Sequence, residues 1–232
     1  MSLKFFGRGS GFSDEHTSAY FSTDNKELVI LDCPVSTFQK LKLLDLSQYK
    51  TFIVLITHTH GDHIGGLGLF IQYAFFTLKK TVNIVAPSHE VQEDIARLLK
   101  IEGNEFSWCN LTNLCHLSKR EWFGNCIATK HSPQLEGKCF GYHLIIGNTD
   151  VIYTGDTSTL EPFIPYLTNK AELYVDTSVY YGMIHLKLED ALPQFIELAE
   201  KGVKIYLMHL DDVVAAEEIV REIPNIEVVT VE

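Results

Sequence analysis

The 232-residue sequence has no long hydrophobic run and no stretch of low complexity. A membrane-spanning helix needs about 20 consecutive apolar residues. Because no run approaches that length, we expect a soluble protein with no membrane partner. The N-terminal ten residues lack the apolar core and the small-residue cleavage site of a secretion signal, which favours a cytoplasmic location. Hydrophobic residues still make up 46% of the chain and aromatic residues 11%, enough for a sizeable core.

Cysteine pairs and positive charge are also scarce. The five cysteines form no C-x-x-C pair, so they fit neither a disulfide framework nor a zinc ribbon, and we expect them to be reduced. Lysine and arginine number 19 against 30 aspartates and glutamates, which gives a net charge of −11. Because such a field repels polyanions, a large nucleic-acid partner is disfavoured.

The length is within the range of one large layered fold, so we predict a single domain over residues 1–232. Its elements follow the order of strands first, then alternating strands and helices. Residues 52–56 are a short apolar run typical of a buried strand. Ser158, with Glu161 three residues on, predicts a capping box for a helix. Segment 104–124 shows no clear periodicity and is not placed.

Histidine and aspartate are concentrated directly after the strand predicted at 52–56. Three imidazoles and one carboxylate occur there within six residues: His58, His60, Asp62 and His63. Alternate residues of an extended chain point the same way, so His58 and His60 can approach one ion. Gly61 lets the chain turn and direct the next two side chains to a second position. The spacing suggests two metals, with a single-metal site and ordinary surface or core histidines as the alternatives.

Other polar residues also follow predicted strands. Each of these comes directly or almost directly after an apolar run: His58, His131, Asp156, Asp176 and His209. If the strands lie side by side, these residues gather at one rim, where open α/β architectures place their sites.

This pattern resembles the metallo-β-lactamase fold superfamily, whose H-x-H-x-D-H motif is matched by His58, His60, Asp62 and His63. The match continues through His131, Gly155-Asp156-Thr157 and His209, and so covers nearly the whole chain. Within the superfamily the sequence is similar to the tRNase Z and small phosphodiesterase branch. The resemblance implies an α+β fold, a four-layer αβ/βα sandwich with metals at one edge of two internal sheets.

The resemblance also implies roles for individual residues. One metal would be held by His58, His60 and His131, and the other by Asp62, His63 and His209, with Asp156 bridging them. Zinc suits these ligands best, and manganese or iron also suits them. The predicted catalytic residues are Asp62, Asp176 and His185. In this branch a Glu and His pair helps to protonate the leaving oxygen. Asp176 stands where the Glu would be and His185 where the His would be, and the shorter carboxylate can still orient an imidazole. The alternative is that Asp176 caps a strand end and His185 is a solvated loop residue.

Two departures argue against tRNA processing. The chain has no long Gly/Pro-rich arm, and Leu210-Asp211-Asp212 follows His209 where the branch carries Ser and then Arg-Tyr. We therefore predict a dinuclear metal-dependent hydrolase of a small-molecule phosphodiester, such as a cyclic nucleotide or a related cyclic phosphate. One alternative is hydrolysis of lactones, thioesters or other carboxylic esters on the same metals. Another is a non-catalytic metal-bound sensor or binding module. The resemblance leaves a homodimer open.

Overall fold

The structure is a computed structural model that describes residues 1–231. The chain divides into two compact units. The N-terminal unit comprises Leu3–Gly7 and Asp14–Lys119, and the C-terminal unit comprises Met1–Ser2, Arg8–Ser13 and Arg120–Val231. Since compact units need not fold independently, the single domain over residues 1–232 stays a prediction.

The N-terminal unit contains one six-stranded sheet in the order β1-β2-β3-β4-β5-β6. Its strands are β1 (Lys4–Gly7), β2 (Ser18–Ser22), β3 (Glu27–Leu31), β4 (Thr51–Leu55), β5 (Val82–Ala86) and β6 (Cys109–Asn113). The first three strands pair antiparallel, and β3 to β6 pair parallel. Strands β3 and β4 are mostly apolar and almost wholly buried, the pattern of parallel strands buried on both faces.

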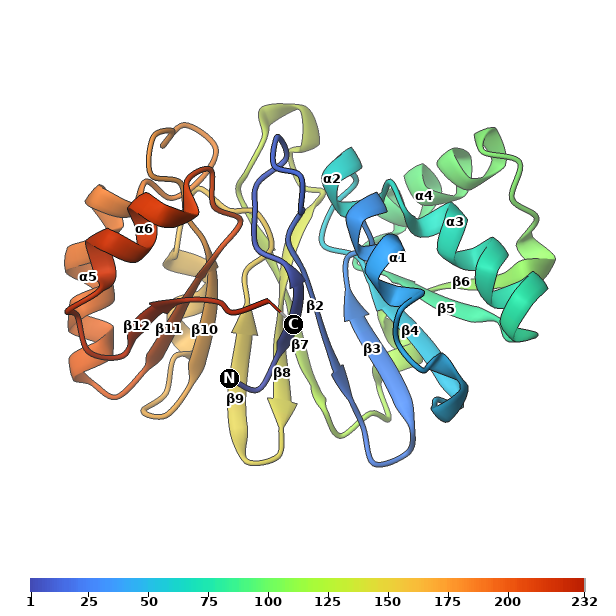
Figure 1. Ribbon diagram of the computed structural model, residues 1–232, viewed down its shortest axis with the longest axis horizontal. Helices are drawn as coiled ribbons and strands as arrows, with labels where there is room; N and C mark the ends of the chain where they lie inside the picture. The colour runs from blue at the N-terminus through green and yellow to red at the C-terminus, as the bar shows by residue number, and fades with distance from the viewer. Residues whose placement is uncertain (232) are drawn as a thin grey trace. The chain divides into compact units, whose positions relative to one another are not determined.

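Helices pack beside this sheet (Figure 1). They are α1 (Val35–Leu41), α2 (Gly61–Ile64), α3 (Leu67–Gln72), the π-helix η2 (Tyr73–Leu78) and α4 (His89–Ile101), with 3₁₀ turns η1 (Leu46–Gln48), η3 (Phe106–Trp108) and η4 (Leu114–Leu117). Helix α4 lies against β5 and β6. The Ser88 hydroxyl caps it by accepting a hydrogen bond from the Val91 amide. No helix among residues 1–231 is long and apolar enough to cross a bilayer.

The C-terminal unit contains a second six-stranded sheet, in the order β12-β11-β10-β9-β8-β7. Its strands are β7 (Phe123–Thr129), β8 (Cys139–Ile146), β9 (Thr149–Tyr153), β10 (Glu172–Asp176), β11 (Lys204–Met208) and β12 (Ile226–Val228). Strands β7, β8 and β9 pair antiparallel, and β9 to β12 pair parallel. Each unit therefore joins one antiparallel meander to a set of parallel strands.

Helices α5 (Leu188–Glu200) and α6 (Val213–Val220) lie side by side on one face of this sheet (Figure 1). Alternate strand residues such as Leu173, Val175 and Leu207 face a core that includes Phe195 of α5. The remaining turns are η5 (Pro133–Leu135) and η6 (Glu161–Tyr166).

The capping box predicted at Ser158 is wrong. Segment η6 is a 3₁₀ turn with no side-chain cap. The Ser158 hydroxyl instead donates to the Lys130 carbonyl at 3.1 Å, and the Ser158 amide donates to the same oxygen at 2.7 Å. The serine thus ties the loop after β9 to the end of β7.

The parallel strands place polar residues at one edge within each unit. In the C-terminal unit Asp176 pairs with Met208 across β10 and β11, so His209 follows directly beyond that edge. Asp156 lies three residues after the end of β9, which pairs with β10 in parallel. In the N-terminal unit Asp32 and His58 follow the parallel strands β3 and β4 in the same way.

Candidate metal centre

The N-terminal unit brings together the four residues of the H-x-H-x-D-H motif. The Nε2 atom of His58 lies 3.0 Å from Nδ1 of His60, and the rings of His58 and His63 are 4.1 Å apart between centroids. Helix α2 begins at Gly61 and carries Asp62 in its first turn, which brings an Asp62 oxygen to 3.4 Å from His63 Nε2. The turn expected at Gly61 therefore gathers four donor groups in one place.

Asp32 is a site residue that the sequence analysis missed. It follows β3 in the left-handed conformation with φ +60° and is fully buried. Its carboxylate accepts hydrogen bonds from His63 Nδ1 at 2.8 Å and from the Thr57 amide at 2.8 Å and hydroxyl at 2.7 Å. Burial raises the pKa of Asp32, and His63 and Thr57 oppose that shift. The only sequence signal was an aspartate directly after an apolar strand, the same signal that marked Asp176.

The C-terminal unit gathers the other predicted residues. An Asp156 oxygen lies 3.5 Å from His131 Nε2 and 3.4 Å from His209 Nε2. One ligand atom from each of four side chains lies within 4.8 Å of the others: Asp156, Asp176, His185 and His209. His209 follows β11 with φ +58°, so the chain turns sharply where the imidazole leaves the sheet.

Asp176 and His185 form a hydrogen-bonded pair. His185 Nδ1 lies 2.7 Å from Asp176 Oδ2, which also accepts the Thr157 amide at 2.8 Å. The other Asp176 oxygen lies 3.3 Å from His209 Nδ1. Burial acts to lower the pKa of His185, but the Asp176 carboxylate outweighs it and the pKa is raised. His185 is only 16% exposed, so it is not a solvated loop residue.

The hydrogen-bond pattern of the imidazoles tests whether they suit a metal ion. In four histidines Nδ1 faces a polar group: the Thr57 hydroxyl for His58, Asp32 for His63, the Ile184 carbonyl for His131, and Asp176 for His209. A partner at Nδ1 fixes the tautomer and leaves Nε2 as the ligand atom. Burial lowers the pKa of His131, and Asp156 opposes it, which favours the neutral, metal-binding form. The residues therefore fit divalent metal binding.

Residues 1–229 match the family described as anti-Pycsar protein Apyc1. The Apyc1 proteins of Bacillus phages BSP38 and vB_BveM-Goe7 are 25% and 28% identical to this chain, over 90% of it and 89% of each relative. A ribonuclease Z of Methanococcus maripaludis is 34% identical over 96 residues, which are 40% of this chain and 31% of the relative.

Solved structures confirm the predicted α+β metallo-β-lactamase fold. The metallo-β-lactamase fold protein YhfI of Bacillus subtilis has a TM-score of 0.72 at 18% identity, over 97% of this chain and 94% of YhfI. A diphosphatase of the PhnP family has a TM-score of 0.69 at 19% identity, over 99% and 94%. Zn²⁺-bound PqqB of Methylobacterium extorquens has a TM-score of 0.72 at 11% identity, over 100% and 98%.

Proposed function

Because the chain belongs to the family of anti-Pycsar protein Apyc1, we propose that it is a metal-dependent hydrolase of small phosphodiesters. The proposed substrate is a cyclic nucleotide or a related cyclic phosphate. The observation that carries the proposal is the Asp176–His185 pair, placed among the Asp156 and His209 ligand atoms. A phosphodiester releases an oxygen that needs a proton, and a histidine fixed beside the ligands can deliver it.

The proposed hydrolase would hold two divalent ions, as the resemblance to metallo-β-lactamases implies. The proposed ligands are His58, His60, Asp62, His63, His131, Asp156 and His209. When bound, such ions supply Lewis-acid chemistry, which polarises the phosphoryl group and lowers the pKa of a water molecule. The nitrogen-rich donor set supports zinc first, with manganese or iron as the other suitable metals.

The chain's own residues supply the rest of the chemistry. His185 donates a proton from Nε2 to the leaving oxygen, while Asp176 holds its Nδ1–H. Asp176 acts through His185 and is therefore a positioning residue. Asp62 would instead bind a metal ion directly as a ligand. Asp32 holds His63 through Nδ1, which directs Nε2 of that ring toward the proposed ion.

The size and charge of the chain support a small substrate. A net charge of −11 opposes binding of a long polyanion, while one cyclic phosphate carries a single charge that the ions can offset.

Because all five cysteines are free thiols, a reducing compartment such as the cytoplasm suits the protein. A homodimer stays a prediction.

Hydrolysis of carboxylic esters on the same metals is the second candidate. The proposed site has no feature that excludes a lactone or thioester, but such a substrate depends less on the His185 proton. The non-catalytic alternative is disfavoured by the fixed proton donor, since a binding module needs no such group.

The test compares hydrolysis of a 3′,5′-cyclic nucleotide, a lactone and a thioester by the zinc-loaded protein. We expect the cyclic nucleotide to have the highest kcat/KM, and His185→Ala to lower its kcat by about 10²- to 10⁴-fold with unchanged metal content. His89→Ala is the matched control, because the His89 side chain is 78% exposed. Preferred turnover of the lactone or thioester would contradict the substrate, and metal loss in His185→Ala would contradict its role.

A further inference from the structure

One segment of the C-terminal unit, residues 177–186, combines few ionisable groups with exposed aromatic rings. Residues 177–186, between β10 and α5, contain no Asp, Glu, Lys or Arg, although the chain has 30 acidic residues. The segment exposes large side chains: Tyr180 is 58% exposed, Tyr181 71% and Met183 93%. Exposed aromatic groups in the segment that carries His185 suggest a contact surface for a ligand.

Asp211 fixes the first half of this segment. Its carboxylate accepts hydrogen bonds from the Ser178 hydroxyl at 2.5 Å, the Val179 amide at 2.7 Å and the Tyr180 amide at 3.1 Å. The Ser178 hydroxyl oxygen in turn accepts the Tyr181 amide at 2.7 Å. Asp211, two positions beyond His209, thus holds three successive residues directly, and it holds Tyr181 through the Ser178 hydroxyl.

The second half of the segment is tied to one proposed metal ligand, His131, and to the positioning residue Asp176. His131 Nδ1 donates to the Ile184 carbonyl at 2.8 Å, and His185 bonds to Asp176. Backbone hydrogen bonds between Ser178 and the chain at Leu186 and Leu188 close the base of the segment. The exposed tip is therefore short and anchored at both ends.

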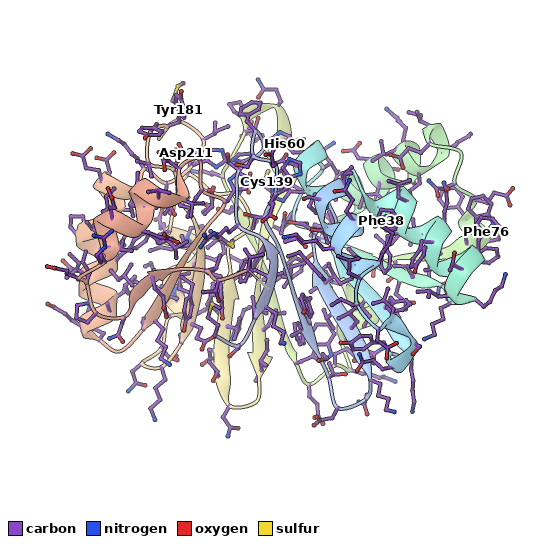
Figure 2. All side chains as sticks on the ribbon, in the orientation of Figure 1. Phe38, His60, Phe76, Cys139, Tyr181 and Asp211 are labelled. Carbon is purple, nitrogen blue, oxygen red and sulfur yellow. The ribbon has the colours of Figure 1, made fainter. Side chains whose placement is uncertain are left out.

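Tyr181 is the exposed ring at this tip, four residues before His185. Figure 2 places it beyond Asp211, extending away from the sheet. Its ring meets that of Tyr180 edge-on, with centroids 6.4 Å apart, while the Tyr180 hydroxyl donates to Asp212 at 2.7 Å. Asp212 therefore fixes Tyr180, while Tyr181 stays 71% exposed.

We propose that segment 177–186 recognises the heterocyclic base of the substrate, with Tyr181 as its stacking face and Asp211 as a positioning residue. The inference rests on the proposed function. Every nucleobase has a π face, so stacking accepts purines and pyrimidines alike. A tyrosine ring offers a large contact area at low entropic cost, and Met183 adapts to different base shapes.

The first experiment compares a 3′,5′-cyclic nucleotide with the corresponding cyclic sugar phosphate that lacks a base. Tyr181→Ala should raise KM for the cyclic nucleotide at least about fivefold and leave KM for the base-free compound unchanged. Tyr181→Phe should restore the wild-type KM because it keeps the ring. Phe76→Ala is the control, since Phe76 is an exposed ring of the N-terminal unit, 53% accessible.

The second experiment tests Asp211 without relying on turnover. In Asp211→Ala the amides of Val179, Tyr180 and Tyr181 should exchange hydrogen faster, while the melting temperature and metal content stay at wild-type values. Binding of the nucleoside monophosphate, measured by calorimetry, should weaken in this variant and in Tyr181→Ala. Unchanged exchange at these amides would show that Asp211 does not hold the segment.

The outcomes separate the two proposals. Suppose that both compounds are hydrolysed and that Tyr181→Ala changes KM for both equally or for neither. Base recognition is then overturned, and the proposed function stands. If neither compound is hydrolysed, the proposed function fails, and the monophosphate binding alone decides on the segment. A change of oligomeric state in Tyr181→Ala, with monophosphate binding unaltered, would instead assign the exposed rings to a contact between copies of the chain.

Discussion

At the scale of single residues, two buried aspartates orient imidazoles of the proposed site. Asp32 follows β3 and holds His63 Nδ1 at 2.8 Å, and Asp176 ends β10 and holds His185 Nδ1 at 2.7 Å. A carboxylate behind an imidazole fixes the ring and raises its basicity as a ligand. Asp176 also lies 3.3 Å from His209 Nδ1, so it serves two rings, while Asp32 serves one.

Asp32→Ala should weaken zinc binding by about 10- to 100-fold, because His63 loses the partner that fixes its tautomer. The measurement is a zinc titration of metal-free protein in competition with a chelator. Asp45→Ala is the control, since the Asp45 side chain only caps an exposed 3₁₀ turn. Equal zinc affinity in wild type and Asp32→Ala would show that Asp32 has a structural role only.

The ligand motif could be predicted from the sequence more readily than the aspartates that hydrogen-bond to the histidines of the site. His58, His60, Asp62 and His63 occur at a dense, characteristic spacing, whereas Asp32 is a single aspartate 31 residues before its partner His63. Nothing local marks such a pairing, because it arises only when β3 and β4 align in parallel. Asp176 could be singled out because the family resemblance supplied its role.

At the scale of elements, a buried strand could be predicted from its apolar run, whereas a polar strand could not. The strand predicted at residues 52–56 is β4, Thr51–Leu55. Segment 104–124 was left unplaced, and it contains β6, whose sequence CNLTN is half polar and mostly not buried. As a strand at the end of its sheet, β6 needs no continuous apolar pattern, so periodicity could not identify it.

Glu172, at the start of β10, should make the folding stability of the protein depend on pH. Glu172 is buried there and accepts hydrogen bonds from the Ser2 amide and the Tyr174 hydroxyl, both at 2.7 Å. Burial acts to raise the pKa of Glu172, but these hydrogen bonds outweigh it and the pKa is lowered. A lowered folded-state pKa adds stability above the unfolded-state pKa, and that stability is lost as pH falls through the folded-state value.

Glu172→Gln should therefore be less stable than wild type at pH 7, and the difference should shrink below about pH 4. Urea denaturation of the metal-free proteins at both pH values measures it, since removing metals avoids their own pH dependence. Glu189→Gln is the control, because the Glu189 side chain is 78% exposed. A difference that stays constant between the two pH values would contradict the role assigned to the carboxylate.

At the scale of the whole molecule, the two units repeat one plan. Each has a six-stranded sheet with a meander and a parallel set, and each places aspartate and histidine after its parallel strands. The strand ends could be predicted from the sequence, but no internal repeat is visible in it, because the two units share a pattern of strand pairing and not a sequence. The family match over residues 1–229 agrees with the resemblance seen in the motifs.

The central claim is that the chain is a hydrolase that depends on two metal ions. Zinc titration of the metal-free protein, with cyclic-nucleotide hydrolysis followed at each step, tests it most directly. Binding and activity should both saturate at about two equivalents per chain, and His60→Ala should lose most of the activity while the exposed-site variant His89→Ala keeps it. Fewer than one metal per chain, or activity in His60→Ala equal to wild type, would contradict the claim.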